Sequence, residues 1–223
     1  MEKQIGGLTL KIFSTEGPFY KFMMQLMDLV VLNFMWILFS IPIITIGAST
    51  TAACSITMKM AREEEGYIAR QFVKEFKRNW KQGTVIWLVM AVLLYAVYLD
   101  SQILKVSEDP SYFVIFMTVA LVLVVIACFS FAFPLIARYE NTIKNTIQNS
   151  IQITIRYIGR TLAMYFSLAL IYVIFSFTQE MLIFMILIGP GAMLYTYGYF
   201  CRQVFAKIEY EDPDSVTNSM HKD

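Results

Sequence analysis

Histidine, charge and cysteine are all scarce in this sequence, and each shortage excludes a class of site. The only histidine is His221, so the chain lacks the residues for a histidine-based catalytic triad or metal site. Charged residues make up 16% of the chain, and no G-x-x-x-x-G-K-[ST] loop for nucleotide phosphates occurs. The cysteines, Cys54, Cys128 and Cys201, lie in apolar segments without the spacing of metal ligands. We therefore expect neither an enzyme nor a protein with a metal or another cofactor.

The charges that do occur are clustered, and long stretches of the chain have none. The chain is 57% hydrophobic and has a mean hydropathy of +0.57, whereas soluble domains are usually about 45–50% apolar. A membrane-spanning helix needs about 20 mostly apolar residues. Surface helices of a soluble bundle would also need a polar stripe. The pattern predicts an all-α, polytopic membrane helix bundle. The charge-free stretches are Leu29–Met58, Gln82–Leu99, Ser111–Ala137, Thr161–Gln179 and Met181–Cys201.

The first charge-free stretch is too long for one span and is expected to turn. A straight helix over Leu29–Met58 would be about 45 Å long, whereas the hydrocarbon core is about 30 Å thick. Pro42, Thr45 and Gly47 favour a structural turn, because proline removes a backbone donor and glycine loosens the chain. A short helix over residues 48–62 follows, either as the second arm of a hairpin or as an interfacial helix that does not cross.

The whole chain is expected to form six helices, five of them full spans and one short or re-entrant. Residues 1–21 form a lead, residues 22–202 a single membrane domain and residues 203–223 a polar tail. The linkers at 63–82 and 138–160 are amphipathic and basic, so the positive-inside rule places both linkers and both termini in the cytoplasm. If the short helix does not cross, the N-terminus moves outside. The expected full spans are Phe22–Ile41, Gly83–Gln102, Tyr112–Ala137, Thr161–Phe177 and Met181–Phe200.

The first linker carries an apolar stripe that could attach the protein to something else. Ile68, Phe72, Phe76 and Trp80 recur every four residues, which places them on one face of a helix with cations on the other faces. Two interpretations stay open: the helix rests on anionic lipid headgroups, or it docks in the groove of a partner.

The second linker is richer in amides than in charge. Asn141, Asn145 and Asn149 accompany isoleucines that again recur every four residues, with few cations and no aromatic residue from Asn141 to Arg156. This composition suits a protein contact, within the chain or with a partner, better than a lipid surface.

A small polar group lies near the start of the first span. Asp28 is an intramembrane acid, which by default suggests a proton or substrate site, although near the helix start it can also reach the interface or a basic residue. Asn33 is expected to hydrogen-bond a neighbouring helix. With Trp36 stacking beside it, Asn33 could also contact a hydroxyl-rich ligand.

Three motifs, in this order and spacing, resemble the YesL family of bacterial integral membrane proteins. Members of that family have no settled biochemical function. Their genes often stand beside those of carbohydrate ABC importers, which implies an accessory role in sugar uptake. The motifs are Leu32–Trp36 with Ile41–Ala48 and Thr51–Ala53, then Phe72 with Phe76–Gln82, and then Phe133–Asn141 with Asn145 and Asn149.

The resemblance implies a non-catalytic accessory subunit of a carbohydrate ABC importer in the bacterial cell membrane. The chain lacks the Glu-Ala-Ala loop with which importer permeases meet their ATPase, so it is not expected to be the permease itself. The alternative is a stand-alone small-solute transporter or channel that acts as an oligomer. Expected partners are the lipid bilayer, permease subunits and further copies of the chain. The net charge of +1 gives no general attraction to nucleic acid.

Overall fold

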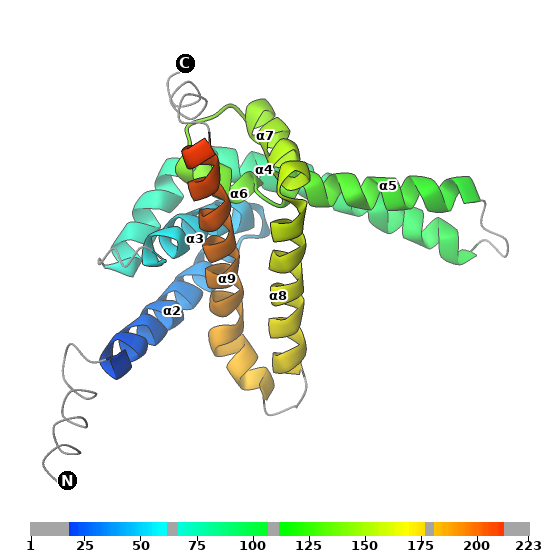
Figure 1. Ribbon diagram of the computed structural model, residues 1–223. Helices are drawn as coiled ribbons and strands as arrows, with labels where there is room; N and C mark the ends of the chain where they lie inside the picture. Colours follow the sequence, from blue (N-terminus) through cyan, green and yellow to red (C-terminus); the bar gives the residue numbers. More distant parts are fainter. Residues whose placement is uncertain (1–17, 62–66, 107–111, 177–180, 212–223) are drawn as a thin grey trace, which may run out of the picture.

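Nearly all of the described part of the chain is helical. The computed structural model describes residues 18–61, 67–106, 112–176 and 181–211, and these contain no strand (Figure 1). Most of the expected N-terminal lead and the end of the expected tail lie outside these ranges. The elements are α2 (Pro18–Ser40), η1 (Ile43–Thr45), α3 (Ile46–Met60), α4 (Ile68–Val106), α5 (Tyr112–Phe129), α6 (Ala132–Arg138), α7 (Ile143–Arg156), α8 (Ile158–Ser176) and α9 (Met181–Glu211).

Within the described residues, four helical segments are long and apolar enough to cross a membrane. They are Phe19–Ser40, Ile68–Gln102, Tyr112–Arg138 and Ile158–Ser176. These segments are mostly not covered by the rest of the protein. In the most apolar 18-residue stretch of each one, no more than 22% is buried. Exposed apolar helices of this length suit lipid rather than water. The all-helical, membrane-protein class predicted from the sequence is therefore confirmed.

Helix α3 lies at the centre of the molecule. It packs against α2, α4, α6 and α9, and all its residues from Gly47 to Met58 except Thr50 are buried. The reason is its composition, since Gly, Ala, Ser and Thr let neighbouring backbones approach closely. At Gly83 of α4, an added Cβ would lie 2.8 Å from the Cα of Ala48. At about 1.5 Å per residue, the 15 residues of α3 span less than the bilayer core.

The charge-free stretch Leu29–Met58, which holds the second half of α2 and most of α3, turns between Ser40 and Ile46. This is the segment where the length argument places a turn. The Thr45 hydroxyl donates to the Phe39 carbonyl over 2.7 Å, and the Thr45 N–H donates to the Pro42 carbonyl over 2.8 Å. The side chain of Thr45 thus closes the end of α2, where carbonyls have no partner within the helix.

Helix α4 corrects one expectation. The amphipathic linker and the third span are one continuous helix of 39 residues, about 58 Å long at the usual rise. No proline interrupts Ile68–Val106, and the one glycine, Gly83, serves the contact with α3 instead of a break.

The expected fourth span, Tyr112–Ala137, matches one of the segments apolar enough to cross a membrane, and within it the helix breaks at Ser130 and Phe131, between α5 and α6. Pro134 explains the break: it has no N–H to donate to the carbonyl four residues earlier, which belongs to Ser130. The Tyr197 hydroxyl donates to that carbonyl over 2.9 Å instead. The Phe131 N–H, freed by the break, donates to the Ser150 hydroxyl of α7 over 3.1 Å.

The helical part of the chain also extends further than predicted at its C-terminal end. Residues 203–211 belong to α9 and not to a polar tail, and Val204 and Phe205 are among the most buried side chains. Polar residues that alternate with these apolar ones hid the buried face. The Arg160 guanidinium of α8 also donates to the Gln203 carbonyl over 2.8 Å.

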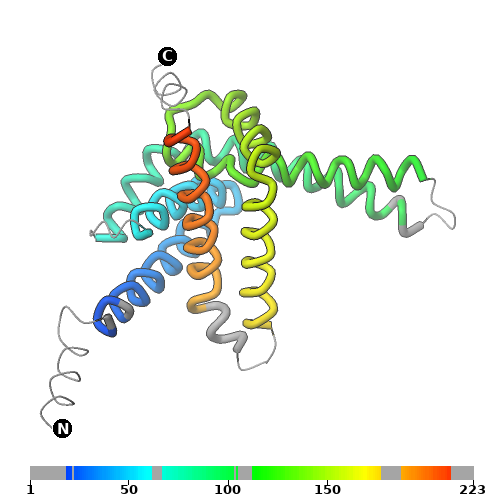
Figure 2. Tube along the Cα trace, in the orientation of Figure 1, coloured from blue at the N-terminus to red at the C-terminus, as the bar shows by residue number. Residues whose placement is uncertain are grey.

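Two helical hairpins diverge from this centre. The pair α4–α5 extends away from the pair α8–α9, and α3, α6 and α7 lie where the two pairs meet (Figures 1 and 2). The polar linkers of the sequence therefore gather at one region of the fold, and the apolar ends of the hairpins separate.

Candidate functional site

Two sequence motifs that lie some distance apart in the chain form the walls of one polar region. The Arg78 guanidinium donates to the Ala137 carbonyl, and the Gln82 amide donates to the Asn141 carbonyl, each over 3.1 Å. Carbonyls at and beyond the end of α6 have no helical partner of their own. The polar face of α4 therefore supplies donors to the C-terminal end of α6.

A buried acid joins α3 to α4 beside these contacts. Glu75 is 4% exposed, and its carboxylate forms ion pairs with Lys59 (3.0 Å) and Arg78 (2.9 Å). A carboxylate out of water needs such partners, because an unpaired buried charge is costly. The pairing fixes Arg78 in the position from which it reaches α6.

A second acid joins α6 to α9. The Arg138 guanidinium lies 2.7 Å from the Glu209 carboxylate, and the Tyr139 hydroxyl donates to the same carboxylate over 2.7 Å. Burial, and then the hydrogen bond to Glu209, raise the pKa of the Tyr139 phenol, so Tyr139 remains a neutral donor. The Arg138 guanidinium also lies 5.8 Å from the centre of the Phe205 ring, within cation–π range.

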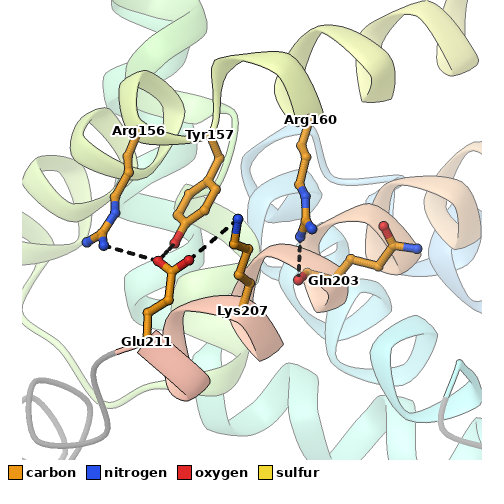
Figure 3. A network of polar contacts seen from close by, with 6 residues as sticks. All are labelled: Arg156, Tyr157, Arg160, Gln203, Lys207 and Glu211. Atoms are coloured by element: carbon orange, nitrogen blue, oxygen red, sulfur yellow. Dashed lines mark hydrogen bonds and ion pairs between the residues drawn. The ribbon is translucent and has the colours of Figure 1, made fainter.

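A third acid, Glu211, holds the end of α9 (Figure 3). Its carboxylate accepts from the Tyr157 hydroxyl over 2.7 Å and pairs with Arg156 at 3.1 Å and Lys207 at 3.5 Å. The hydrogen bond from Tyr157 is the largest cause that lowers the pKa of Glu211, and the nearby cations add to it against a smaller opposing effect of desolvation.

This cluster should make the end of α9 sensitive to acid. A carboxylate whose pKa is lowered by folding stabilises the fold above its unfolded pKa of about 4.5, and the contribution is lost as pH falls through the lower, folded pKa. We expect amide-exchange protection of residues 203–211 to decrease on acidification from about pH 6 to about pH 3.5, after correction for intrinsic rates. Glu211→Gln should show low protection at both pH values, and Glu140→Gln should behave as the wild type. Equal protection of the wild type at both pH values would contradict the assignment.

The apolar stripe on α4 does not form a partner surface along its whole length. Ile68 and Phe72 are buried inside the chain, and Phe76 packs partly against the same cluster. The Phe39 ring of α2 lies 5.4 Å from Phe72 and 4.8 Å from Phe76 between ring centres. Assignment of Ile68 and Phe72 to partner binding is therefore wrong, because α2 and α3 already cover them. Trp80, 49% exposed, is the one member that remains on the surface.

The amide-rich helix α7 makes its main polar contact within the chain. The residues that make it are not the asparagines predicted as contacts. Its buried polar side chains are Thr146, Ser150 and Thr154. Both Ser150 and Thr154 donate to the Ala127 carbonyl at the end of α5, over 3.1 and 3.2 Å. Their spacing of four residues was visible in the sequence. The reason for it, a helix break to be satisfied at Phe131, was not.

The amides predicted as partner contacts lie on other faces of the α6–α7 region. Asn145 is exposed, while Asn141 and Asn149 are half-buried. Asn141 accepts from Gln82 through its backbone only. The amide side chains are therefore not what attaches α7 to the fold.

Asn33 and Trp36, two of the three intramembrane polar residues, hydrogen-bond neighbouring helices. The Asn33 amide, 2% exposed, donates to the Leu187 carbonyl of α9 over 2.7 Å, one turn before Pro190, where proline disturbs the helical hydrogen bonds. The Trp36 indole donates to the Thr50 hydroxyl over 3.2 Å. Asp28 lies half-buried on α2. Asn33 and Trp36 thus join α2 to α9 and α3.

An apolar groove of about 590 Å³ lies where the two hairpins diverge. Trp36 of α2 contributes to it, together with residues of α4, α5, α6, α8 and α9. Apart from the hydroxyls of two tyrosines and the indole N–H, its side chains are hydrocarbon or thioether. The lining is Trp36, Met90, Leu94, Val125, Ile126, Phe129, Phe133, Tyr165, Leu168, Pro190, Met193, Leu194 and Tyr197.

The thiols of these regions are buried, and three of their acids are paired. Among the residues described, no group of three or more His, Cys, Asp or Glu could hold a metal ion. Cys54, Cys128 and Cys201 are buried as free thiols. The acids Glu75, Glu209 and Glu211 are each engaged by cations of neighbouring helices.

Comparison with known proteins gives a family resemblance and no function. A family model described as a protein of unknown function, DUF624, matches residues 29–101, roughly a third of the chain. This is the family to which YesL proteins belong. No curated protein and no solved structure matches the chain. The matched segment covers α3, the second half of α2 and most of α4, so the likeness to this family of unknown function lies in the central helix and in two of the helices that pack against it.

Proposed function

We propose that the chain is a non-catalytic accessory subunit that binds the permease subunits of a carbohydrate ABC importer within the membrane. The observation that carries the proposal is the apolar groove between the diverging hairpins. Its lining belongs largely to helices that can span a membrane, and its volume of about 590 Å³ can accept several large side chains of a partner helix. The importer as partner rests on the resemblance to the YesL family.

The membrane arrangement that goes with this function has six helices, five full spans and the short α3 crossing as the second arm of a hairpin with α2, with both termini in the cytoplasm. The groove then lies at membrane depth, where transmembrane helices associate through close van der Waals packing. An apolar groove offers little to a hydroxyl-rich solute, since a route for such a solute needs polar groups along its walls. That favours an accessory role over transport by this chain alone.

Filling the groove should prevent partner binding. We expect Leu94→Trp combined with Met193→Trp to reduce permease recovery about tenfold, equivalent to about 1.4 kcal/mol, in a mild-detergent pull-down followed by mass spectrometry. The matched control is Phe166→Trp, at a position on α8 that is 71% exposed and does not line the groove.

Recovery of permease subunits with the wild type and the control, but not with the groove variant, supports the proposal. Recovery of this chain alone as an oligomer would instead favour a stand-alone small-solute transporter or channel. Uptake of labelled sugar by liposomes that contain this chain alone would overturn the accessory role.

A further inference from the structure

The proposed function does not use the few hydrogen-bonding groups of the apolar groove. Among the described residues that line it, three have polar atoms that can form hydrogen bonds in their side chains, namely Trp36, Tyr165 and Tyr197. The Trp36 indole N–H already donates to the Thr50 hydroxyl over 3.2 Å. What the groove can offer an occupant therefore depends on where the two tyrosine hydroxyls direct their protons.

The proton of Tyr197 is used at the break between α5 and α6. The Tyr197 hydroxyl donates to the Ser130 carbonyl over 2.9 Å, because Pro134 has no N–H for that carbonyl. A tyrosine hydroxyl has one proton to donate and lone pairs that accept. With the proton used at Ser130, the Tyr197 oxygen can only accept a further hydrogen bond.

The proton of Tyr165 is used at the same serine. The Ser130 hydroxyl lies 2.6 Å from the Ile126 carbonyl oxygen and 2.9 Å from the Tyr165 hydroxyl. A carbonyl oxygen only accepts, so the serine proton is donated to Ile126. The Tyr165 hydroxyl then donates to the serine oxygen, and its own oxygen is also left as an acceptor.

Both tyrosine oxygens keep lone pairs for an occupant of the groove. No described N–H or O–H group donates to either of them. Tyr165 is 38% exposed and Tyr197 is half-buried, whereas Ser130 is 1% exposed and does not line the groove. The described lining of the groove therefore presents hydrocarbon, thioether and two acceptor oxygens, and no free donor.

This pattern of acceptors without donors selects among the molecules that could fill the groove. A lipid chain brings no donor, and the ester carbonyls of a glycerolipid only accept. Serine and threonine of a helix commonly donate to a carbonyl of their own helix, as Thr118 and Ser167 do in this chain. An amide side chain would bring a donor together with a carbonyl oxygen that the groove cannot satisfy. The tryptophan indole is apolar apart from one N–H and only donates, so it complements the groove.

We propose that the groove accepts a partner helix that places a tryptophan against Tyr165 and Tyr197 and donates the indole N–H to one of their oxygens. That the partner is a membrane helix rests on the proposed function. The need for a donor follows from the groove itself. Its volume of about 590 Å³ has room for an indole together with neighbouring apolar side chains.

The test compares indole with benzofuran, which has nearly the same size and shape but an acceptor oxygen in place of the N–H. The full chain is placed in nanodiscs, and binding of each probe is measured by saturation-transfer NMR. We expect the wild type to bind indole about three- to tenfold more tightly than benzofuran, the range of hydrogen bonds between membrane helices. Tyr165→Phe should abolish this preference, whereas partition of the probes into lipid is the same for both proteins.

Tyr165→Phe is a clean variant because it leaves no donor of the chain unpaired. The Ser130 proton stays on the Ile126 carbonyl, so the melting temperature should remain close to that of the wild type. The matched control is Tyr172→Phe, which removes a hydroxyl from α8 at a position that is 54% exposed and outside the groove lining. It should keep the preference for indole. Leu94→Trp with Met193→Trp, which fills the groove, should bind neither probe.

Equal binding of indole and benzofuran by the wild type would overturn the inference. So would a preference for indole that survives Tyr165→Phe, or a wild type that binds neither probe. The permease pull-down separates this inference from the proposed function. A preference for indole without recovery of permease subunits supports the donor requirement and refutes the importer as partner. Equal recovery of permease by the wild type and Tyr165→Phe, without a preference for indole, refutes the inference alone.

Discussion

Alanine at Gly83 is expected to prevent stable folding of the bundle, with a loss of more than about 3 kcal/mol. The added methyl group would lie 2.8 Å from the Cα of Ala48 and 3.0 Å from the backbone nitrogen of the same residue. Backbone atoms cannot rotate away as a side chain can, so α3 and α4 would have to separate. Separation would expose the faces that each of them buries against the other.

The position that faces Gly83 on α3 should behave in the same way. A Cβ at Gly47 would meet the Gly83 carbonyl oxygen and would lie 2.5 Å from the Cβ of Trp87. Alanine at Gly47 is therefore a second, independent test of the same close helix crossing.

Gly159 of α8 offers a matched control, because a Cβ added there would meet nothing within 4 Å. Alanine at Gly159 should stabilise the protein by up to about 1 kcal/mol, since glycine is a poor helix former. Thermal unfolding in detergent, followed by circular dichroism and by elution volume, measures all three variants. A Gly83→Ala protein that melts within a few degrees of the wild type would mean that α3 and α4 do not cross at this point.

The sequence predicts those features that depend on composition along the chain. Long apolar segments without charge predict membrane helices, and the helical segments long enough to span appear in the structure at four such places. The turn near Pro42 follows from length alone, since one helix over Leu29–Met58 exceeds the bilayer. Neither argument depends on which helices pack against each other.

The features that the sequence does not reveal depend on contacts between distant segments. The stripe of Ile68, Phe72 and Phe76 has the same periodicity whether it faces lipid, a partner or another helix of the chain. Only the position of Phe39 on α2 decides the question. The sequence predicts a polar tail in place of the end of α9 for a related reason. Glu209 and Glu211 are typical of a solvated tail, and only the fold places Arg138 and Arg156 beside them.

In the candidate sites, too, the sequence predicts single motifs but not the contacts between them. Polar motifs at 77–82 and 136–140 could be recognised in the sequence, but their meeting in one pocket could not. The helix break at Phe131 is an intermediate case. Pro134 and the hydroxyl of Ser150 are both visible in the sequence, and only the fold brings the hydroxyl to the freed N–H of Phe131.

Truncation of Phe72 should show whether the stripe on α4 holds the fold or attaches a partner. Phe72 of α4 is fully buried against α2 and α3. Phe72→Ala is therefore expected to lower the free energy of unfolding by about 3–5 kcal/mol. Trp80→Ala, on the same stripe at a position that is 49% exposed, should cost far less, because surface substitutions usually change stability by less than about 0.5 kcal/mol. Melting temperature and partner recovery are measured together. A Phe72→Ala protein that melts like the wild type but loses its partners would return the stripe to the role of a docking surface, against the packing of Phe39 on Phe72 and Phe76.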